Sequence, residues 1–244
     1  MSSLIVPTWS APENVVAFNT TRKGGVSTSP YDGLNLGTHV GDDAAIVAEN
    51  RRLLTEMSGA PSEPFWLEQV HGVRVLRLNA DSDRTDNQAD ASYTDVAGQV
   101  CTVMTADCLP VLFCNRQGTE VAAAHAGWRG LCQGVLEQTL ACFRSAPEDI
   151  VAWLGPAIGP EMFEVGAEVR EAFMLQDVDA EQAFVARRDK YLADIYQLAR
   201  LRLRRAGVHD ISGGDLCTVS DRSRFFSYRR EPVTGRMAAL IWFR

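Results

Sequence analysis

Short apolar runs that recur along the chain predict a set of buried strands. The segments 99–106, 109–115 and 119–126 are apolar at nearly every position, so they lack the alternation of a strand with one face in water. Short continuous runs of this kind are typical of strands that are covered on both faces. Strand-like composition also marks 14–21, 73–78, 149–160 and 236–243, and 149–160 ends in Gly and Pro turns.

Helices are predicted where apolar residues recur about every 3.6 positions. They are expected at 42–59, after Gly130, at 166–175 and at 191–207. The expected apolar faces are Ile46, Asn50, Leu53, Leu54 and Met57 in the first; Cys132, Val135, Leu136, Leu140 and Phe143 in the second; and Leu192, Ile195, Tyr196, Ala199, Leu203 and Ala206 in the last. Gly59 and Gly207 mark the ends of the first and last helices.

The order of these elements favours one α/β domain that spans residues 1–244. Strands and helices are mixed without a strict strand–helix–strand rhythm, and the polar segment 79–92 is expected to be a loop. No low-complexity linker divides the chain, and no short repeat is convincing. We therefore predict an α/β (α+β) fold with mixed β-sheets.

Composition and charge narrow the possible partners. The formal net charge of −7 makes duplex nucleic acid a poor partner, since phosphate binding needs a basic face. Anionic small molecules stay compatible, because a few local arginines are enough for them. No apolar run approaches the ~18 residues of a membrane span, and the N-terminus shows no signal peptide. The six cysteines are scattered through apolar segments, so we expect reduced thiols and a cytoplasmic protein.

Three residues at the ends of apolar runs are candidates for a metal site. His71 lies in WLEQVHG, Cys108 in TADCLPVLF and His125 in AAAHAGWRG. Two imidazoles and one thiolate suit zinc and leave a fourth position open, as in catalytic zinc sites. The spacing alone is a weak signal, because a histidine in an apolar run is more often a core residue. A lone cysteine is likewise more often a small buried hydrophobe.

Other residues are candidates for the walls of such a pocket. Asp107 is a candidate catalytic residue that relays a proton. The candidates for substrate binding are Arg22, Asn35, Arg51, Gln69, Trp128 and Arg129. Glycines after Arg22 and a helix start at Arg129 would favour an anion, although each arginine also fits a solvated or ion-paired role. Trp66 and Phe163 can stack on a base, and Tyr228, Arg229 and Arg230 form a further polar cluster. His39 and His209 are interpreted as loop or surface residues.

Four ordered motifs resemble those of one family. WLEQVHG, TADCLPVLF, HAGWRG and GPAIGP occur in the order found in the laccase-domain family, also called the polyphenol oxidase or purine nucleoside phosphorylase family. This family includes the bacterial peptidoglycan editing factor. The resemblance begins at TTRKGGVS and YDGLNLGTHVGD and continues to FFSYRR, so it covers nearly the whole chain, with no departure at the motif positions.

The resemblance implies two mixed sheets packed between helix layers and a zinc site at His71, Cys108 and His125. It also implies phosphorolysis of adenosine, inosine and methylthioadenosine, adenosine deamination, and in some members phenol oxidation with copper. A role in keeping wrong amino acids out of peptidoglycan precursors is attributed to bacterial members. The expected partners are therefore a purine nucleoside and phosphate.

Three alternatives stay open at this stage. Cys108 and His125 fit the nucleophile and base of a cysteine hydrolase that acts on an amide, for example in a muropeptide. A multicopper laccase is disfavoured, because its copper sites need far more than the four histidines present. A zinc-stabilised binding protein without catalysis is the non-enzymatic alternative.

Overall fold

A six-stranded mixed sheet lies at the centre of the molecule. The computed structural model describes residues 3–244, and the strand order of this sheet is β12-β8-β6-β7-β4-β3. The pairs β12/β8 and β3/β4 are parallel and the other three pairs are antiparallel. Its strands are β3 (Val75–Arg77), β4 (Ala91–Thr94), β6 (Leu109–Asn115), β7 (Val121–Ala126), β8 (Ile150–Leu154) and β12 (Asp210–Gly213).

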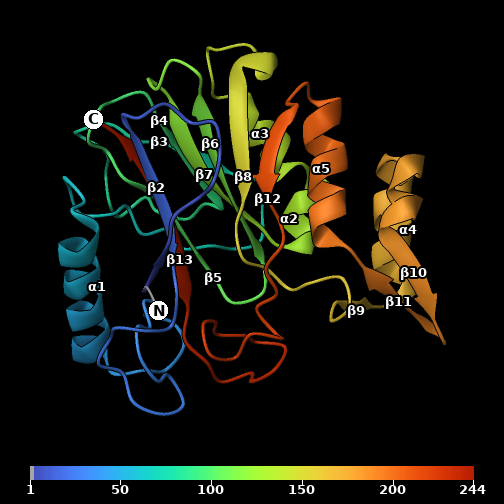
Figure 1. The fold of residues 1–244 in the computed structure, drawn as a ribbon, viewed down its shortest axis with the longest axis horizontal. Coiled ribbons are helices and arrows are strands. Elements are labelled where there is room, and N and C mark those ends of the chain that lie inside the picture. The colour runs from blue at the N-terminus through green and yellow to red at the C-terminus, as the bar shows by residue number, and fades with distance from the viewer. Residues whose placement is uncertain (1–2) are drawn as a thin grey trace.

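A second, antiparallel sheet packs against one face of the first. It has the order β1-β2-β13-β5, and a shared cluster of apolar side chains from both sheets fills the space between them. Its outer face is covered by α1 (Ala44–Ser58), which Figure 1 shows beside β2 and β13. The strands are β1 (Leu4–Ile5), β2 (Val15–Thr20), β5 (Cys101–Thr105) and β13 (Met237–Phe243).

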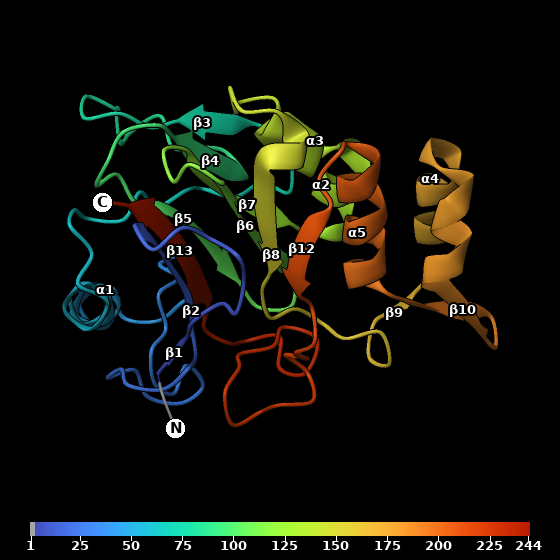
Figure 2. The same cartoon turned by 45° about the horizontal axis from the view of Figure 1, so that its top comes forward.

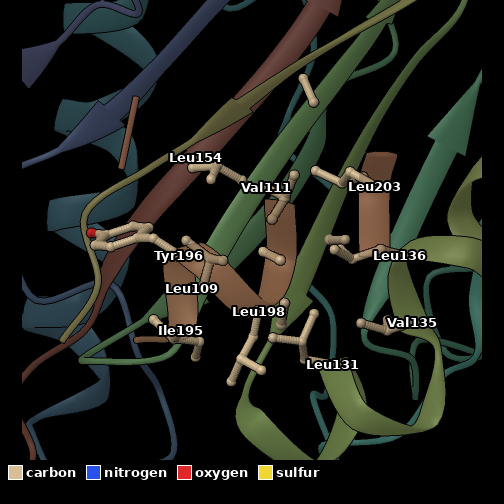
Figure 3. Close-up of a cluster of buried hydrophobic side chains, with 14 of the residues drawn as sticks. Leu109, Val111, Leu131, Val135, Leu136, Leu154, Ile195, Tyr196, Leu198 and Leu203 are labelled. Carbon is tan, nitrogen blue, oxygen red and sulfur yellow. The ribbon is translucent and has the colours of Figure 1, made fainter. Parts of the chain in front are cut away.

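Helices cover the other face of the six-stranded sheet. Leucines and valines of α2 (Trp128–Gln133), α3 (Val135–Leu140) and α5 (Ile195–Arg205) meet side chains of β6 and β8 in one cluster, drawn in Figure 3. Beyond α5 lie α4 (Ala167–Gln176) and a small sheet of order β10-β11-β9, at one side of the molecule in Figures 1 and 2.

The small sheet consists of β9 (Glu164–Val165), β10 (Phe184–Arg187) and β11 (Lys190–Ala193). Two 3₁₀ helices, η1 (Pro147–Asp149) and η2 (Val178–Ala183), complete the elements. Among the helices of residues 3–244, none is both long and apolar enough to cross a membrane.

The continuous apolar run at β6 follows from its position between two cores. Successive side chains of a strand point to opposite faces. Val111 and Phe113 therefore face the helices, while Leu112 and Cys114 face the four-stranded sheet. Because both faces are buried, neither can be polar, which confirms the expectation of strands covered on both sides.

The predicted α/β fold class is confirmed, and three local predictions were wrong. Residues 191–193 belong to strand β11 and not to the last helix, which starts only after the cap Asp194. The helix expected after Gly130 is two helices, because Gly134 takes a left-handed φ of 102° between them. The polar segment 79–92 ends in the first two residues of the buried strand β4, Ala91 and Ser92, which carry little strand signal.

The face of α1 that packs inward also differs from the prediction. Val47, Asn50 and Leu54 are buried, whereas Met57 is exposed. Asn50 is buried because its amide donates to Ser27 Oγ at 2.9 Å and to Asn35 O at 2.8 Å. A polar residue therefore anchors this helix to the loop that precedes it.

The packing between the two sheets should dominate stability. Replacing Leu112 by Ala removes a fully buried side chain from this interface, and should lower the free energy of unfolding by about 2–5 kcal/mol. Leu175→Ala is the control, because Leu175 is 86% exposed and its loss should change stability by less than ~0.5 kcal/mol. Urea denaturation measures both, and equal effects would contradict this account of the core.

Candidate metal centre

The pairing of β6 with β7 brings Cys108 and His125 together. In this antiparallel pair Pro110 lies opposite His125, so both side chains share one face of the sheet. Cys108 lies two residues before Pro110 and immediately before β6, so strand alternation directs it to the same face, towards the four-stranded sheet. Two residues 17 positions apart thus become diagonal neighbours at a strand end.

A buried carboxylate, Asp90, fixes the third member of the group. It accepts hydrogen bonds from the backbone N–H groups of Val70, His71 and Gly72 at 3.2, 2.9 and 2.7 Å. These bonds hold His71 in a left-handed conformation with φ of 61°, which is uncommon for a residue with a side chain. The same carboxylate accepts a bond from His125 Nδ1 at 2.9 Å, so the Nε2 of that ring is left for other partners.

The donor atoms of His71, Cys108 and His125 all lie within 4.8 Å of one another. Cys108 Sγ is 3.8 Å from His71 Nε2, close to the roughly 3.3–3.6 Å expected between ligands of a tetrahedral zinc ion. The two imidazole rings meet edge to face with 4.8 Å between their centroids. The donor types and their separations therefore fit a metal ion, with His125 oriented by a carboxylate as metal-bound histidines commonly are.

Gly127 has no side chain, and this leaves room for the side chains of His71 and Cys108. A Cβ at this position would lie 2.9 Å from His71 Cδ2 and 3.1 Å from Cys108 Sγ. At Gly130 a Cβ would lie 2.7 Å from the carbonyl oxygen of Gly72. The two glycines of HAGWRG are therefore required by close approach of the His71 loop.

The protonation states of the group are coupled. Burial opposes ionisation of Cys108, but the charge of His125 and hydrogen bonds from both histidines outweigh it and lower the pKa of the thiol to about 6. Burial also opposes protonation of His125, yet the Cys108 thiolate and Asp90 raise its pKa to about 9. Despite burial, His125 and backbone N–H groups hold the pKa of Asp90 below its usual value. The metal-free group is thus a thiolate–imidazolium pair supported by a carboxylate.

Asp107 lies beside Cys108, and its carboxylate is hydrogen-bonded to the C-terminal loop. Its carboxylate accepts hydrogen bonds from Thr218 Oγ1 at 2.5 Å, Ser227 Oγ at 3.0 Å and the backbone N–H of Arg229 at 2.6 Å. The residue has a φ of 94° and is almost completely buried. The geometry favours a positioning role for Asp107, in which it holds the loop over the donor group.

A cavity of about 960 Å³ opens above the donor group. The residues that line it include most of those predicted from sequence for the metal site and its walls: His71, Arg51, Gln69, Asp107, Cys108, His125, Trp128 and Arg129. The lining also includes Trp66, Phe163, Tyr228 and Arg229. Gln69 is bound by the backbone of Met104, donating to its oxygen and accepting from its nitrogen at 2.7 Å each, so it shapes the wall. Arg129 is exposed and its guanidinium lies 4.4 Å from the centroid of the Trp128 ring.

Arg22 and Asn35 lie outside the residues that line this cavity. The guanidinium of Arg22 stacks on Phe226 at 4.7 Å and donates to the Asp32 carbonyl. Asn35 is fully buried, and its Oδ1 accepts from the backbone N–H groups of Gly37 at 3.0 Å and Arg236 at 2.9 Å. Both residues therefore organise the loops behind the cavity wall.

Sequence reasoning missed three residues of this site. Asp90 was not singled out because it lies in a polar segment. The signal available was its position directly before the small residues that begin β4. Arg236 begins the last apolar strand and lines the cavity, so a charge at a strand end was the available signal. His39 was interpreted as a surface residue; it is exposed, and it stands at the rim of the same cavity.

The chain is similar in sequence to a known protein family and to several named proteins. The family described as multi-copper polyphenol oxidoreductase laccase matches residues 16–244. A protein of Escherichia coli (strain K12) named purine nucleoside phosphorylase YfiH is 62% identical over 99% of each chain. A purine nucleoside phosphorylase of Haemophilus influenzae is 52% identical over 98% of each chain.

Solved structures share the fold. A crystal structure of a Neisseria meningitidis protein superposes with a TM-score of 0.93 and 48% identity over 99% of each chain. The structure of YlmD from Geobacillus stearothermophilus gives a TM-score of 0.83 and 33% identity, over 95% of this chain and 93% of that one.

Removing the charge of Asp90 should loosen the metal site. Asp90→Asn keeps the shape but loses the carboxylate that orients His125 and the His71 loop, so metal affinity should fall roughly 10–100-fold. Asp86→Asn is the control, because Asp86 is exposed, pairs with Arg74 and lies outside the residues that line the cavity. Competition with a chromophoric chelator measures both affinities. An Asp90→Asn protein with unchanged affinity would contradict the role of this carboxylate.

The low pKa of Cys108 predicts its reactivity in metal-free protein. Only the thiolate reacts with iodoacetamide, so modification should accelerate through about pH 6 and not near the ~8.5 of a free thiol. In urea the same residue should return to the higher range, because unfolding separates it from His125. Mass spectrometry of the Cys108 peptide follows the reaction, and a midpoint above pH 8 in the folded protein would contradict the ion pair.

Proposed function

The chain belongs to the family described as multi-copper polyphenol oxidoreductase laccase, and we propose that it is a zinc-dependent purine nucleoside phosphorylase. The observation that carries the proposal is the convergence of His71, Cys108 and His125 at the floor of a cavity lined by aromatic and cationic side chains. The names of the relatives support the same activity.

The donor set favours one zinc ion over a copper cluster. Two imidazoles and one thiolate leave a free coordination position, and zinc bound there supplies a Lewis acid. A multicopper centre needs many more histidines than the four in this sequence. Within residues 3–244, the His71, Cys108 and His125 set is the one group suited to a metal. Phenol oxidation with copper would thus be a side activity at the same three ligands.

The cavity offers what phosphorolysis requires. In this reaction a phosphate oxygen forms a bond to the anomeric carbon, the bond from that carbon to the purine breaks, and the departing purine takes a proton. The sugar becomes positively charged in the transition state, as in glycoside cleavage. Trp66, Trp128 and Phe163 offer faces for a flat base, and nearby arginines offer charge for phosphate.

The nucleosides that fit this proposal are adenosine, inosine and methylthioadenosine. Deamination of adenosine is a second activity that a metal held by these three residues would support, since it would activate a water for attack on the purine ring. The chain lacks the H-x-E and P-C-x-x-C signature of known zinc deaminases, so phosphorolysis is the preferred activity. Asp107 is poorly suited to give the proton to the base, since its oxygens already accept three hydrogen bonds.

A second candidate function follows from the ion pair of the metal-free group. The Cys108 thiolate lies next to the His125 imidazolium, which in turn is bound by the Asp90 carboxylate. This is the arrangement of a cysteine hydrolase. In such an enzyme the Cys108 sulfur would attack an amide carbonyl, the C–N bond would break, and the amine would leave with a proton from His125. Water would then hydrolyse the resulting thioester and free the thiolate. This enzyme would remain active after metal removal, whereas the phosphorylase would not.

Cys108→Ala tests the proposal directly. The variant should lose at least tenfold in metal affinity, since a thiolate ligand is removed, and should lose nucleoside cleavage with it. Its fold should persist, because the side chain lies immediately before β6 and outside the main clusters. Metal analysis, circular dichroism and release of free purine are measured together, with Cys142→Ala as the matched control. Normal release of purine by Cys108→Ala would contradict the proposed phosphorylase.

A further inference from the structure

Two arginines and a histidine gather on one wall of the cavity. His39 lies in the loop before α1, Arg51 lies on α1, and Arg236 immediately precedes β13. Arg129 lies on α2, and Arg229 donates to the oxygens of Met162 and Glu164 next to β9. Figures 1 and 2 show α1 on one side of the sheets and α2 and β9 on the other. The cavity thus carries two separate groups of basic side chains.

The arginines on the α1 side are held by neutral partners. Arg51 donates through Nε and Nη2 to the Leu36 oxygen at 3.1 and 2.9 Å, and its guanidinium lies 4.0 Å from the ring centroid of Trp66. Arg236 donates through Nη1 to the oxygens of Thr234 and Gly235 at 3.2 and 3.1 Å. In the described part of the chain neither guanidinium has a carboxylate within 4.0 Å, unlike the neighbouring Arg52, which pairs with Glu49 and Glu56.

Burial disfavours the positive charge of each of these three side chains. Burial lowers the pKa of Arg51 to about 10 and also lowers that of Arg236. The pKa of His39 is lowered by partial burial and then by the positive charges of Arg236 and Arg51. Glu63 acts on the charge of Arg51, and Asp107 on that of Arg236, without an ion pair within 4.0 Å. Burial of these two charges is costly, and an anion bound to them would reduce the cost.

The wall adjoins the donor group. The Cys108 thiol and the Asp107 carboxyl both act on the charge of Arg236, which therefore lies near the metal ligands. The backbone of Arg236 is fixed by Asn35, so the guanidinium is carried on a rigid support. Thr105, almost fully buried, lines the same cavity, and its hydroxyl has no hydrogen-bond partner in residues 3–244.

We propose that His39, Arg51 and Arg236 form the subsite for a phosphate group, beside the metal ligands and across the cavity from Arg129. Guanidinium groups recognise phosphate oxygens through paired, charge-assisted hydrogen bonds. The inference rests on the proposed phosphorolysis for its assignment of this anion as inorganic phosphate. A phosphate monoester, such as a nucleoside 5′-monophosphate, presents the same group and is the second source.

Calorimetric titration of the purified, metal-replete protein with inorganic phosphate, and separately with adenosine 5′-monophosphate, tests the subsite without turnover. Arg236→Gln and Arg51→Gln should each raise the Kd for inorganic phosphate roughly tenfold or more. Arg236→Lys keeps the charge but not the paired donors and should lie between. The control is Arg84→Gln, because Arg84 also stacks on an aromatic ring and donates to backbone oxygens, yet lies outside the cavity. Thermal melting and metal content confirm that each variant is folded and loaded.

Several outcomes would overturn the inference. They are unchanged phosphate binding in both glutamine variants, equal weakening by Arg84→Gln, or weakening by Arg129→Gln in their place. Binding of the monoester alone, with loss in Arg236→Gln, would support the subsite and overturn inorganic phosphate as its occupant.

Nucleoside cleavage is followed in parallel, so the two proposals can fail separately. Phosphate binding that depends on Arg236, without phosphorolysis, would contradict the proposed function and keep the subsite. Phosphorolysis with an unaltered KM for phosphate in both glutamine variants would keep the function and contradict the subsite.

Discussion

The candidate site depends on one buried carboxylate with four hydrogen bonds. Asp90 accepts from three successive backbone N–H groups of the His71 loop and from the imidazole of His125. A buried charge is tolerated only when such bonds replace its hydration. The interaction therefore has two effects at once, because it bends the loop into a left-handed turn and fixes the orientation of a ring on β7. Without it, residues 54 positions apart would have no common anchor.

The sheet architecture provides the remaining constraint. Strands β6 and β7 are buried on both faces, so their register cannot slip without exchanging the side chains of the two cores. That register places His125 opposite Pro110 and close to Cys108, and His125 and Cys108 both line the cavity. Polar side chains are tolerated there because the cavity replaces apolar packing. The C-terminal loop, held by Asp107, forms another wall of the same space.

Sequence reasoning predicted the fold class and named three residues, His71, Cys108 and His125, whose side chains the structure brings together. It failed where tertiary contacts decide. Runs such as 109–115 coincide with strand β6, because a short run that is apolar at every position suits a strand buried on both faces. Strands β4 and β11 were missed because they are short and composed of small or mixed residues, so neighbours and not local preference determine their state. The roles of Asp90 and Arg236 were invisible for a similar reason. An acid in a polar segment and an arginine before a strand look like surface residues until the backbone brings them to the cavity. Conversely, Arg22 and Asn35 lie next to glycine-containing loop motifs in the sequence, but in the fold they lie behind the cavity wall and do not line the cavity.

The account as a whole is tested most directly by adding zinc back to metal-free protein while inosine cleavage is followed by ³¹P NMR. If His71, Cys108 and His125 hold one ion that the reaction needs, activity should rise linearly to one zinc ion per chain and then stop rising. The phosphorus signal should pass from inorganic phosphate to ribose 1-phosphate in step with release of hypoxanthine. Cleavage at full rate before zinc is added, or cleavage that leaves the phosphate signal unchanged, would contradict the account.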